Sequence, residues 1–400
     1  MQETEFYQVL LSLPDLVVDS VELSTKRITL HCHVRTPQQN CPHCLRPNTQ
    51  VNQYTQREVR DLDISGRQVW LVVRVRQFVC PDCDRYFTEQ LSFADSGKSH
   101  THRQANGVAR RWIFDCCAKQ PFTEVGALLD VNAKTVERIY YQHVNACLDL
   151  PARYAAVRRL GIDEISHRKG KASYCCVLTD LDKNIALEVL PSRSKATLIA
   201  HFQKLGPEFC AQIESVSFDM WSAYHTVSQR FFPQAVQVVD RFHVVKALNK
   251  VLDALRSKLR REQPLVEAFK NIKWDLFKAR LTAVQEARLQ EAFAHSPLLR
   301  DLVALRNDFH LRFESATNPD ELEQALRKWT TKARAIRQRG LIDFVHMLNN
   351  WLRPIANFAY ERLTNAATEG LNNVIRYVKR ISYGLPKFEH LRLRVLAQAM

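Results

Sequence analysis

The spacing of apolar residues changes along this chain, and each spacing predicts a different kind of structure. Valine and arginine alternate in RQVWLVVRVRQFVC (67–80), a pattern typical of an antiparallel strand with one wet face. Short apolar runs separated by turn residues fill positions 157–245 and predict alternating strands and helices. Positions 246–349 lack strand alternation and are rich in Leu, Ala, Arg, Lys and Glu, which predicts helices. The pattern therefore predicts an α/β protein of several domains.

The region 157–245 predicts three hairpin-like strands followed by helix, strand, helix and strand. This order is typical of a ribonuclease H-like sheet, in which the first and fourth strands are neighbours. Asp163 lies in the first strand and Asp219 ends the fourth, so we expect their carboxylates to converge. Each could instead be structural, Asp163 as a strand cap and Asp219 as the N-cap of the next helix. Asp240 ends the following strand and is the rival of Asp219.

The segment TNAATEGLNNVIRYVKRISYG (364–384) places one carboxylate, Glu369, in a helix otherwise rich in amides and cations. Its polar residues recur at three- and four-residue steps, so one helix face is expected to contact DNA phosphates while Glu369 points toward the other acids. The predicted DNA contacts are Asn372, Asn373, Arg376, Lys379 and Arg380. Three converging carboxylates can hold two Mg²⁺ or Mn²⁺ ions for phosphodiester chemistry. The alternative is a solvated amphipathic helix.

Four of the eleven cysteines have the spacing of a metal site. They form two CxxC knuckles, Cys41–Cys44 and Cys80–Cys83, separated by the predicted strand. Two such knuckles can present four thiolates to one tetrahedral Zn²⁺ ion. The alternative is four buried thiols. The odd number of cysteines also argues against a disulfide framework.

The segment FTEVGALLDVNAKTVERIYYQHV (122–144) predicts two helices joined by a tight turn at residues 130–132. Asn132 is the expected N-cap of the second helix. This spacing is typical of a helix-turn-helix, although any helical hairpin can produce it. In such a module Lys134, Thr135 and Arg138 would contact base edges and phosphates.

The charge of the chain favours a polyanionic partner. Lysine and arginine number 57 against 42 aspartate and glutamate, which gives a net charge of +15 and a pI near 9.4. Nucleic acid is favoured over membrane because the chain has no long apolar run. The N-terminus lacks the pattern of a signal peptide, so we expect a cytoplasmic protein.

The tryptophans of the helical region offer a further DNA contact. QALRKWTTKARAIRQRG (324–340) contains six cations and no acid, and Trp329 lies among them. Such a residue can stack on a flipped base, or the run can be only a solvated face. We expect Trp274 and Trp351 to be core or helix-packing residues.

Several motifs together resemble the ISL3 family of bacterial insertion-sequence transposases. They are the two knuckles with RQFVCPDCDRYFTEQ, then GIDEIS, VSFDMWSAY, VVDRFHVVK and TNAATEGLNNVIRYVKRISYG. The resemblance implies a zinc ribbon, a helix-turn-helix and a DDE catalytic domain with Asp163, Asp219 and Glu369 as its metal-binding triad. It also implies DNA strand cleavage at the ends of the element, followed by strand transfer. Asp240 and His243 match the pattern too, and His243 could contact DNA, position a phosphate or be structural.

These expectations divide the chain into five segments. They are a zinc-ribbon DNA-binding domain (1–97), a helix-turn-helix domain (98–150), the first part of a ribonuclease H-like core (151–245), a helical insertion (246–349) and the second part of the core with the Glu369 helix (350–400). Expected partners are double-stranded DNA, both terminal inverted repeats and target, and further copies of the chain in a homodimer or larger assembly.

Two other classes of function share part of this pattern. A DNA-binding transcriptional regulator with an inactive transposase-like domain would keep the knuckles and lose the acids. A stand-alone ribonuclease H-like nuclease would cleave with the same metals but would not need two appended DNA-reading modules. Joined DNA products would separate a transposase from both.

Overall fold

The computed structural model of the 400-residue chain describes residues 3–93, 104–105, 107–166, 174–263, 265–278, 280–363, 366–383, 385 and 387–400. It divides into two compact units, one formed by Met1–Leu148 with Val378–Gln398 and the other by Asp149–Tyr377 with Ala399–Met400. The predicted boundary between residues 97 and 98 lies outside the described residues, and the predicted segment 350–400 is divided between the units. Within the described ranges, no helix is long and apolar enough to cross a membrane.

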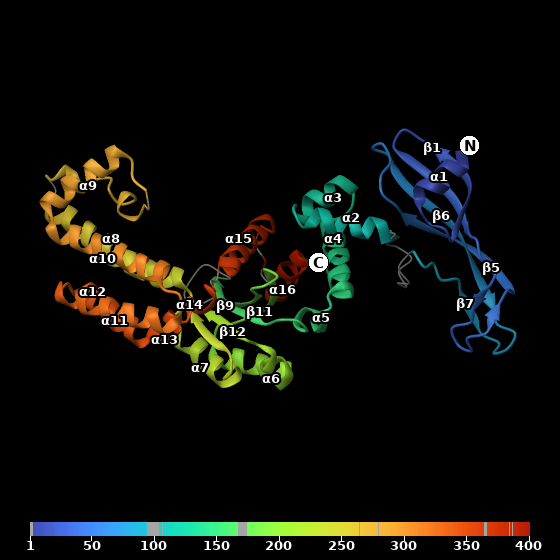
Figure 1. Cartoon of the computed structure of the whole chain (residues 1–400). Coiled ribbons are helices and arrows are strands. Elements are labelled where there is room, and N and C mark those ends of the chain that lie inside the picture. Colours follow the sequence, from blue (N-terminus) through green and yellow to red (C-terminus); the bar gives the residue numbers. More distant parts are fainter. Residues whose placement is uncertain are drawn as a thin grey trace. The chain divides into compact units, whose positions relative to one another are not determined.

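The first unit contains an N-terminal sheet and a group of helices (Figure 1). Its elements are α1 (Glu3–Leu11), β1 (Leu16–Leu23), β2 (Arg27–Val34), β3 (Gln39–Asn40), β4 (Pro47–Asn48), β5 (Val51–Arg60), β6 (Gln68–Val79), β7 (Tyr86–Thr88), β8 (Gln104–Ala105), α2 (Gly107–Cys117), α3 (Phe122–Leu129), α4 (Ala133–Cys147), the end of α15 (Ala366–Ile381) and α16 (Phe388–Leu396). The predicted strand at 67–80 is β6, which pairs with β2 on one side and β5 on the other. Leu71 and Val73 of β6 are buried in the core of this sheet.

The predicted helical hairpin is confirmed in α3 and α4. Asp130 ends α3 in the left-handed conformation, with φ of 52°. Asn132 is the N-cap of α4, and its side chain accepts a hydrogen bond from the backbone N–H of Lys134. The turn is tight because the backbone N–H of Val131 returns to the carbonyl of Gly126 at 2.8 Å. A glycine is required at 126, since a Cβ there would lie 2.5 Å from the Val131 carbonyl oxygen.

A buried cation near the C-terminus holds the helices of the first unit together. Arg394 of α16 is 1% exposed, and it donates hydrogen bonds to the carbonyl of Cys117 and the hydroxyl of Ser382. Its guanidinium also lies over the rings of Phe122 and Tyr140, 4.6 and 5.3 Å from their centroids. Helix α16 therefore completes the core that α2, α3 and α4 begin.

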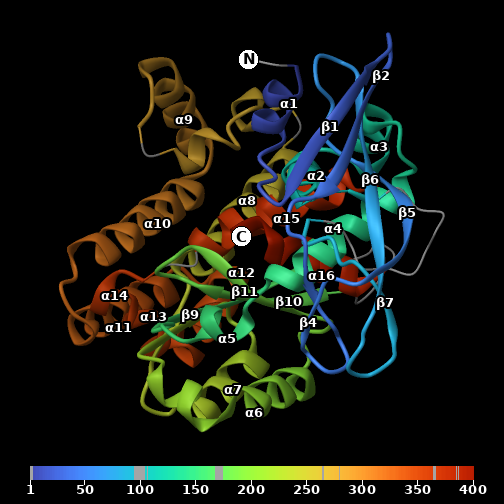
Figure 2. The same ribbon diagram turned by 90° about the vertical axis from the view of Figure 1, so that its right-hand side faces the viewer.

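The second unit is built on a five-stranded mixed sheet. Its elements are α5 (Leu150–Tyr154), β9 (Arg159–Ser166), β10 (Tyr174–Asp180), β11 (Ile185–Leu190), α6 (Lys195–Gln212), β12 (Ser215–Phe218), α7 (Ser222–Phe231), β13 (Val236–Val239), α8 (Arg241–Glu262), η1 (Glu267–Phe269), η2 (Asp275–Phe277), α9 (Ala283–His295), α10 (Pro297–Ser315), α11 (Pro319–Ala335), α12 (Arg339–Asn350), α13 (Leu352–Ala356), α14 (Phe358–Glu361), most of α15 and η3 (Ala397–Ala399). The strand order is β11-β10-β9-β12-β13. Helices α6 and α7 lie on one face of the sheet and α15 on the other (Figures 1 and 2).

The pairing of these strands agrees with the predicted order. β9, β10 and β11 form an antiparallel meander, and β12 is parallel to both β9 and β13. The first and fourth strands of this unit are therefore neighbours. Phe218 at the end of β12 is level with Ile162 of β9 and with Val239 of β13. The residues that follow these three positions are Asp219, Asp163 and Asp240.

The region 246–349 is helical, as predicted, but two of its tryptophans are not where we expected them. Trp329 is fully buried, and its indole N–H donates to the carbonyl of Leu305 at 2.9 Å. It packs against Phe309 and Phe344 and is inaccessible to a base. Trp274, which we expected to be a core or helix-packing residue, is 70% exposed. The DNA role of Trp329 and the packing role of Trp274 are both wrong.

We expect Gly126→Ala to destabilise the first unit. The added Cβ would meet backbone atoms of the α3–α4 turn, which cannot move aside without breaking the turn, so the cost should be about 1–3 kcal/mol. Thermal unfolding of the full chain, with hydrogen exchange to locate the change to α3 and α4, measures it. Gly370→Ala in α15 is the matched control because nothing lies within 4 Å of its added Cβ, and alanine there should be neutral or stabilising. Equal stability of the two variants would contradict the steric argument.

Candidate active site

Three acids gather along three adjacent strands: Asp163 lies within β9, Asp219 directly follows β12 and Asp240 directly follows β13. Ile162, Phe218 and Val239 are level with one another across the three strands. Each acid directly follows one of these residues, so the strand register brings the three acids to the same part of the sheet. The backbone N–H of Asp240 continues the ladder by donating to the carbonyl of Phe218 at 3.0 Å. Asp163 and Asp240 are buried, and Asp219 is half-buried. Buried carboxylates are costly unless they are paired or bind a cation.

Asp163 is held on both of its oxygens. Its Oδ1 accepts from the backbone N–H of Glu164 at 2.7 Å, and its Oδ2 accepts from Nδ2 of Asn372 on α15 at 2.8 Å. Burial raises the pKa of Asp163, while the Glu164 N–H, His243 and the Asn372 amide oppose that rise. The predicted alternative of a simple strand cap does not account for the contact with α15.

Asp219 has the most unusual environment of the three. Burial, together with the charges of Glu164 and Asp163, raises its pKa to about 7. Its Oδ1 is buried and has no hydrogen-bond partner among the described residues. It does not cap α7, whose N-cap position is Trp221. The acid is thus placed among other acids without the donors that such a position normally has.

Asp240 has a structural role that the other two acids lack. It is the N-cap of α8, and its Oδ1 accepts from the backbone N–H of Phe242 at 3.2 Å. His243 lies one turn further, with Nε2 3.9 Å from Asp240 Oδ2. The charge of Asp240 also raises the pKa of Asp219, so it belongs to the same cluster.

Glu164 and Arg193 are members of this cluster that the sequence did not reveal. Neighbouring residues of a strand point to opposite faces, so the strand pattern separates Glu164 from Asp163. The Glu164 carboxylate accepts from Arg193 at 2.6 Å and from the Tyr224 hydroxyl at 3.5 Å, away from the Asp163–Asn372 contact, yet its charge acts on Asp219. No local pattern marks Arg193, which lies in the loop between β11 and α6.

Helix α15 brings its amide rather than its carboxylate to Asp163. Asn372, predicted to contact DNA, is buried with its Nδ2 on Asp163, and its Oδ1 has no partner among the described residues. Glu369 is exposed one turn earlier on the helix. Residues three apart have Cβ atoms about 5–6 Å from each other, so Glu369 lies beside the Asn372 contact. Within the described residues, the structure shows no contact between the Glu369 carboxylate and Asp163 or Asp219.

The remaining predicted DNA contacts of α15 are accessible to different degrees. Asn373, Arg376 and Arg380 are exposed and Lys379 is half-buried. Arg376 donates to Asn373 at 2.6 Å. On α4, Lys134 and Arg138 are exposed and Thr135 is half-buried. These side chains form polar surfaces near the start of α4 and along α15.

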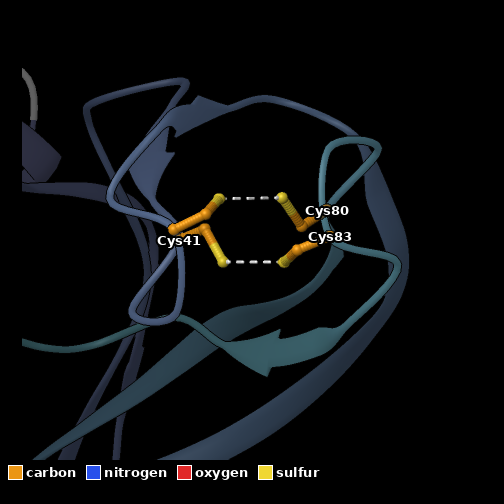
Figure 3. A group of neighbouring side chains, drawn as sticks. Cys41, Cys80 and Cys83 are labelled. Atoms are coloured by element: carbon orange, nitrogen blue, oxygen red, sulfur yellow. Dashed lines mark hydrogen bonds between the residues drawn. The ribbon is translucent and has the colours of Figure 1, made fainter.

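The four predicted knuckle cysteines come together. Their sulfur atoms all lie within 4.8 Å of one another, with Cys41 3.7 Å from Cys83 and Cys44 3.5 Å from Cys80 (Figure 3). Among the residues that the structure describes, these cysteines are the one group of three or more His, Cys, Asp or Glu side chains with ligand atoms this close together. The three predicted carboxylates, Asp163, Asp219 and Glu369, do not form a second such group within the described ranges.

The two knuckles have the same backbone design. In the first, the N–H of Leu45 donates to the carbonyl of Cys41 with Leu45 at a φ of 63°; in the second, the N–H of Asp84 donates to the carbonyl of Cys80 with Asp84 at 50°. Phe78 and Phe87 stack beneath them, 5.2 Å between centroids. Four convergent thiols with this support fit a closed tetrahedral Zn²⁺ site.

Sequence comparison relates this chain to known protein families. Residues 160–395, more than half of the chain, match the ISL3 DDE family described as "Transposase". Residues 37–83 match the zinc-finger of transposase IS204/IS1001/IS1096/IS1165. The chain is 29% identical over 365 residues to the transposase for insertion sequence element IS1001 of Bordetella parapertussis, covering 89% of this chain and 88% of the relative. It is 26% identical over 355 residues to the transposase for IS1557 of two Mycobacterium tuberculosis strains, covering 82% and 78%. The chain therefore belongs to the ISL3 family of insertion-sequence transposases.

Proposed function

We propose that the second unit is a ribonuclease H-like catalytic domain in which Asp163, Asp219 and Glu369 are the catalytic carboxylates. The observation that carries the proposal is the register of β9 with β12, which sets Asp163 and Asp219 side by side, both with raised pKa. A strand meander followed by parallel strands supports the fold assignment. Glu369 joins the site through α15, whose Asn372 already contacts Asp163.

The donor set fits a hard divalent cation. Oδ1 of Asp219 and Oδ1 of Asn372 are buried acceptors without a hydrogen-bond partner among the described residues. Carboxylate and amide oxygens are the ligands that Mg²⁺ and Mn²⁺ prefer. Two such ions, when bound, supply an activated attacking oxygen and stabilise the leaving oxygen of a phosphodiester. Asp163, Asp219 and Glu369 would hold them, and a shift of Glu369 toward the pair is part of the proposal.

The residues of the chain orient and balance this site. Asn372 fixes the Asp163 carboxylate, and Arg193 partly offsets the negative charge that surrounds Asp219. In the cleavage step the oxygen of water bonds to phosphorus, the P–O3′ bond breaks, and the released strand keeps a 3′-hydroxyl. In the transfer step that hydroxyl attacks a target phosphodiester and displaces another 3′-oxygen, so no external energy source is required.

We further propose that the first unit reads DNA. A zinc ribbon and a helix-turn-helix with Lys134, Thr135 and Arg138 would bind the terminal inverted repeats, and Asn373, Arg376, Lys379 and Arg380 would contact phosphates. The net charge of +15 supports a DNA partner. His243, which lies close enough to act on the pKa of Asp163, would contact a phosphate at the site. Pairing of two DNA ends would require a homodimer or a larger homo-oligomer.

Loss of any proposed catalytic carboxylate should greatly slow cleavage and joining without loss of DNA binding. We expect Asp163→Asn, Asp219→Asn and Glu369→Gln each to lower the rate on a duplex carrying the terminal repeats, with Mg²⁺, by a factor on the order of 10² or more. Glu208→Gln, an exposed acid on α6, is the control that should keep full activity. Undiminished activity of Glu369→Gln would remove it from the triad. Binding without activity in the wild-type protein would favour a regulator, and cleavage without joining a nuclease.

Removal of the Asp219 charge should stabilise the protein in buffer without added divalent cations. Because the folded-state pKa of Asp219, about 7, exceeds its ordinary value of 3.8, the folded protein holds this proton more tightly than the unfolded chain. That stabilisation is complete below the unfolded value and is lost as the pH rises through about 7. We expect Asp219→Asn to melt at a higher temperature than wild type at pH 8 and to decline less between pH 5 and 8. Asp343→Asn, an exposed acid on α12, should follow wild type; parallel curves for all three proteins would contradict the clustering of charge.

Zinc should be required for the ribbon and not for catalysis itself. We expect Cys83→Ser to lose bound zinc, measured by mass spectrometry of the metal, and to lose hydrogen-exchange protection in β6 and β7. Cys147→Ser changes an exposed cysteine outside the cluster and should retain the zinc. Full zinc content in Cys83→Ser would place the metal elsewhere.

A further inference from the structure

An aromatic and cationic cluster stands next to Asp219 and has no assigned role. The guanidinium of Arg193 lies over the rings of Tyr174 and Trp221, with Cζ 4.5 Å from each centroid. The same guanidinium donates to Glu164 at 2.6 Å. Trp221 follows Asp219 by two residues, and its backbone N–H donates to the Asp219 carbonyl at 2.7 Å. The cluster is thus joined to Asp219 through the backbone of Trp221 and to Glu164 through an ion pair.

Its two aromatic side chains are accessible. Trp221 is 40% exposed and Tyr174 is 38% exposed. Large rings of this kind usually lie in the core, as Trp329 does with no exposed surface. Trp221 is restrained although it is exposed, because Arg193 packs over its ring and α7 begins at the next residue. A rigid, exposed ring beside an active site is a stacking surface that is already in place.

The chemistry of the cluster favours a nucleobase over a phosphate. The cation of Arg193 is shared between one carboxylate and two rings, so what the cluster offers to a ligand is chiefly aromatic surface. Every base has a π-face, and stacking on tryptophan does not require a particular sequence. The acid cluster acts on the DNA backbone, and a base attached to the scissile strand would lie within reach of a residue two positions from Asp219.

We infer that Trp221, held by Arg193, stacks on a base that leaves the double helix next to the scissile phosphodiester. This inference rests on the proposed function of the acid cluster. Trp221 is a positioning residue: it would stabilise an opened strand end and hold the phosphodiester at the carboxylates. Unstacking a base is unfavourable, and an aromatic surface offsets part of that cost.

Photo-crosslinking tests the contact without requiring cleavage. Terminal-repeat duplexes would carry 5-iododeoxyuridine at successive positions around the cleavage point, and the full-length protein would be irradiated in Ca²⁺. We expect a crosslink from one position to Trp221, identified by mass spectrometry, that is lost in Trp221→Ala. The crosslink should persist in Trp274→Ala, which removes a more exposed tryptophan that also lies near a cation, Lys273. Absence of a Trp221 crosslink at every position would overturn the inference.

Cleavage kinetics in Mg²⁺ test the role. We expect Trp221→Ala to slow cleavage about 5- to 150-fold, the loss of one base stack, and Trp221→Phe to retain most of the rate. An abasic site at the crosslinked position should restore Trp221→Ala toward the wild-type rate on the same DNA, because no base then needs to be unstacked. An equal deficit on intact and abasic DNA would show a structural role and overturn the inference, as would an undiminished rate.

Failure of the proposed function would be recognised separately. If Asp219→Asn cleaved at the wild-type rate, the carboxylate assignment would be wrong, whereas the crosslink in Ca²⁺ would still report whether a base reaches Trp221.

Discussion

The parallel pairing of β12 between β9 and β13 is the constraint on which the active-site region depends. Side chains alternate along a strand, so a shift of one residue in this pairing would turn Asp219 away from Asp163. Register is enforced by the core, since every residue of β12 is buried and Phe218 is fully buried between its neighbours. The apolar residues of the strand thereby fix the acids that follow it. Uncharged residues of the strand core thus determine how close the charged side chains of Asp163 and Asp219 lie to each other.

Such a charge cluster opposes folding and must be balanced within the unit. Asp163 has two donors, Asp240 caps a helix and Glu164 has Arg193, but Asp219 has a buried oxygen without a partner. The proposed binding of cations at these acids needs this incomplete balance, because a carboxylate oxygen that is fully hydrogen-bonded has no lone pair left for a metal ion. The knuckles differ in this respect. Their four thiols face one another, and the ion that fits between them leaves no open position for a substrate.

Helix α15 belongs to both units, and this gives its sequence two kinds of constraint. Up to Tyr377 it is part of the second unit, where Asn372 contacts Asp163. From Val378 it is part of the first unit, which contains α3 and α4. Ser382, directly after α15, accepts from Arg394 of α16, which also holds Cys117. The segment that carries Glu369 therefore continues without a break into the core of the proposed DNA-reading helices. A substitution near residue 378 could affect both.

Local patterns predicted much of this protein, and the failures have a common physical cause. The knuckles, the α3–α4 turn with Asn132, and the strands ending at Asp219 and Asp240 depend on short-range spacing, which one sequence contains. Arg193 and Glu164 could not be placed, because their importance comes from tertiary contacts between β9, a loop and α7. The assignment of Glu369 still depends on its place in α15 and on the family resemblance.

Trp329 and Trp221 both show where prediction from sequence fails, Trp329 because its charged neighbours suggested exposure and Trp221 because no pattern marks it. Trp329 lies among cations in the sequence, but Leu322, Leu326 and Ala333 recur with it at helical spacing, and that apolar stripe is the side of α11 that is buried. Periodicity was therefore the better guide, since a helix has one buried face whatever the charge of the other. Trp221 has no such stripe, because it precedes α7 by one residue and is placed by Asp219 and Arg193. An aromatic residue at the junction of a strand and a helix escapes both periodicities, and this junction is where catalytic residues of α/β sheets gather.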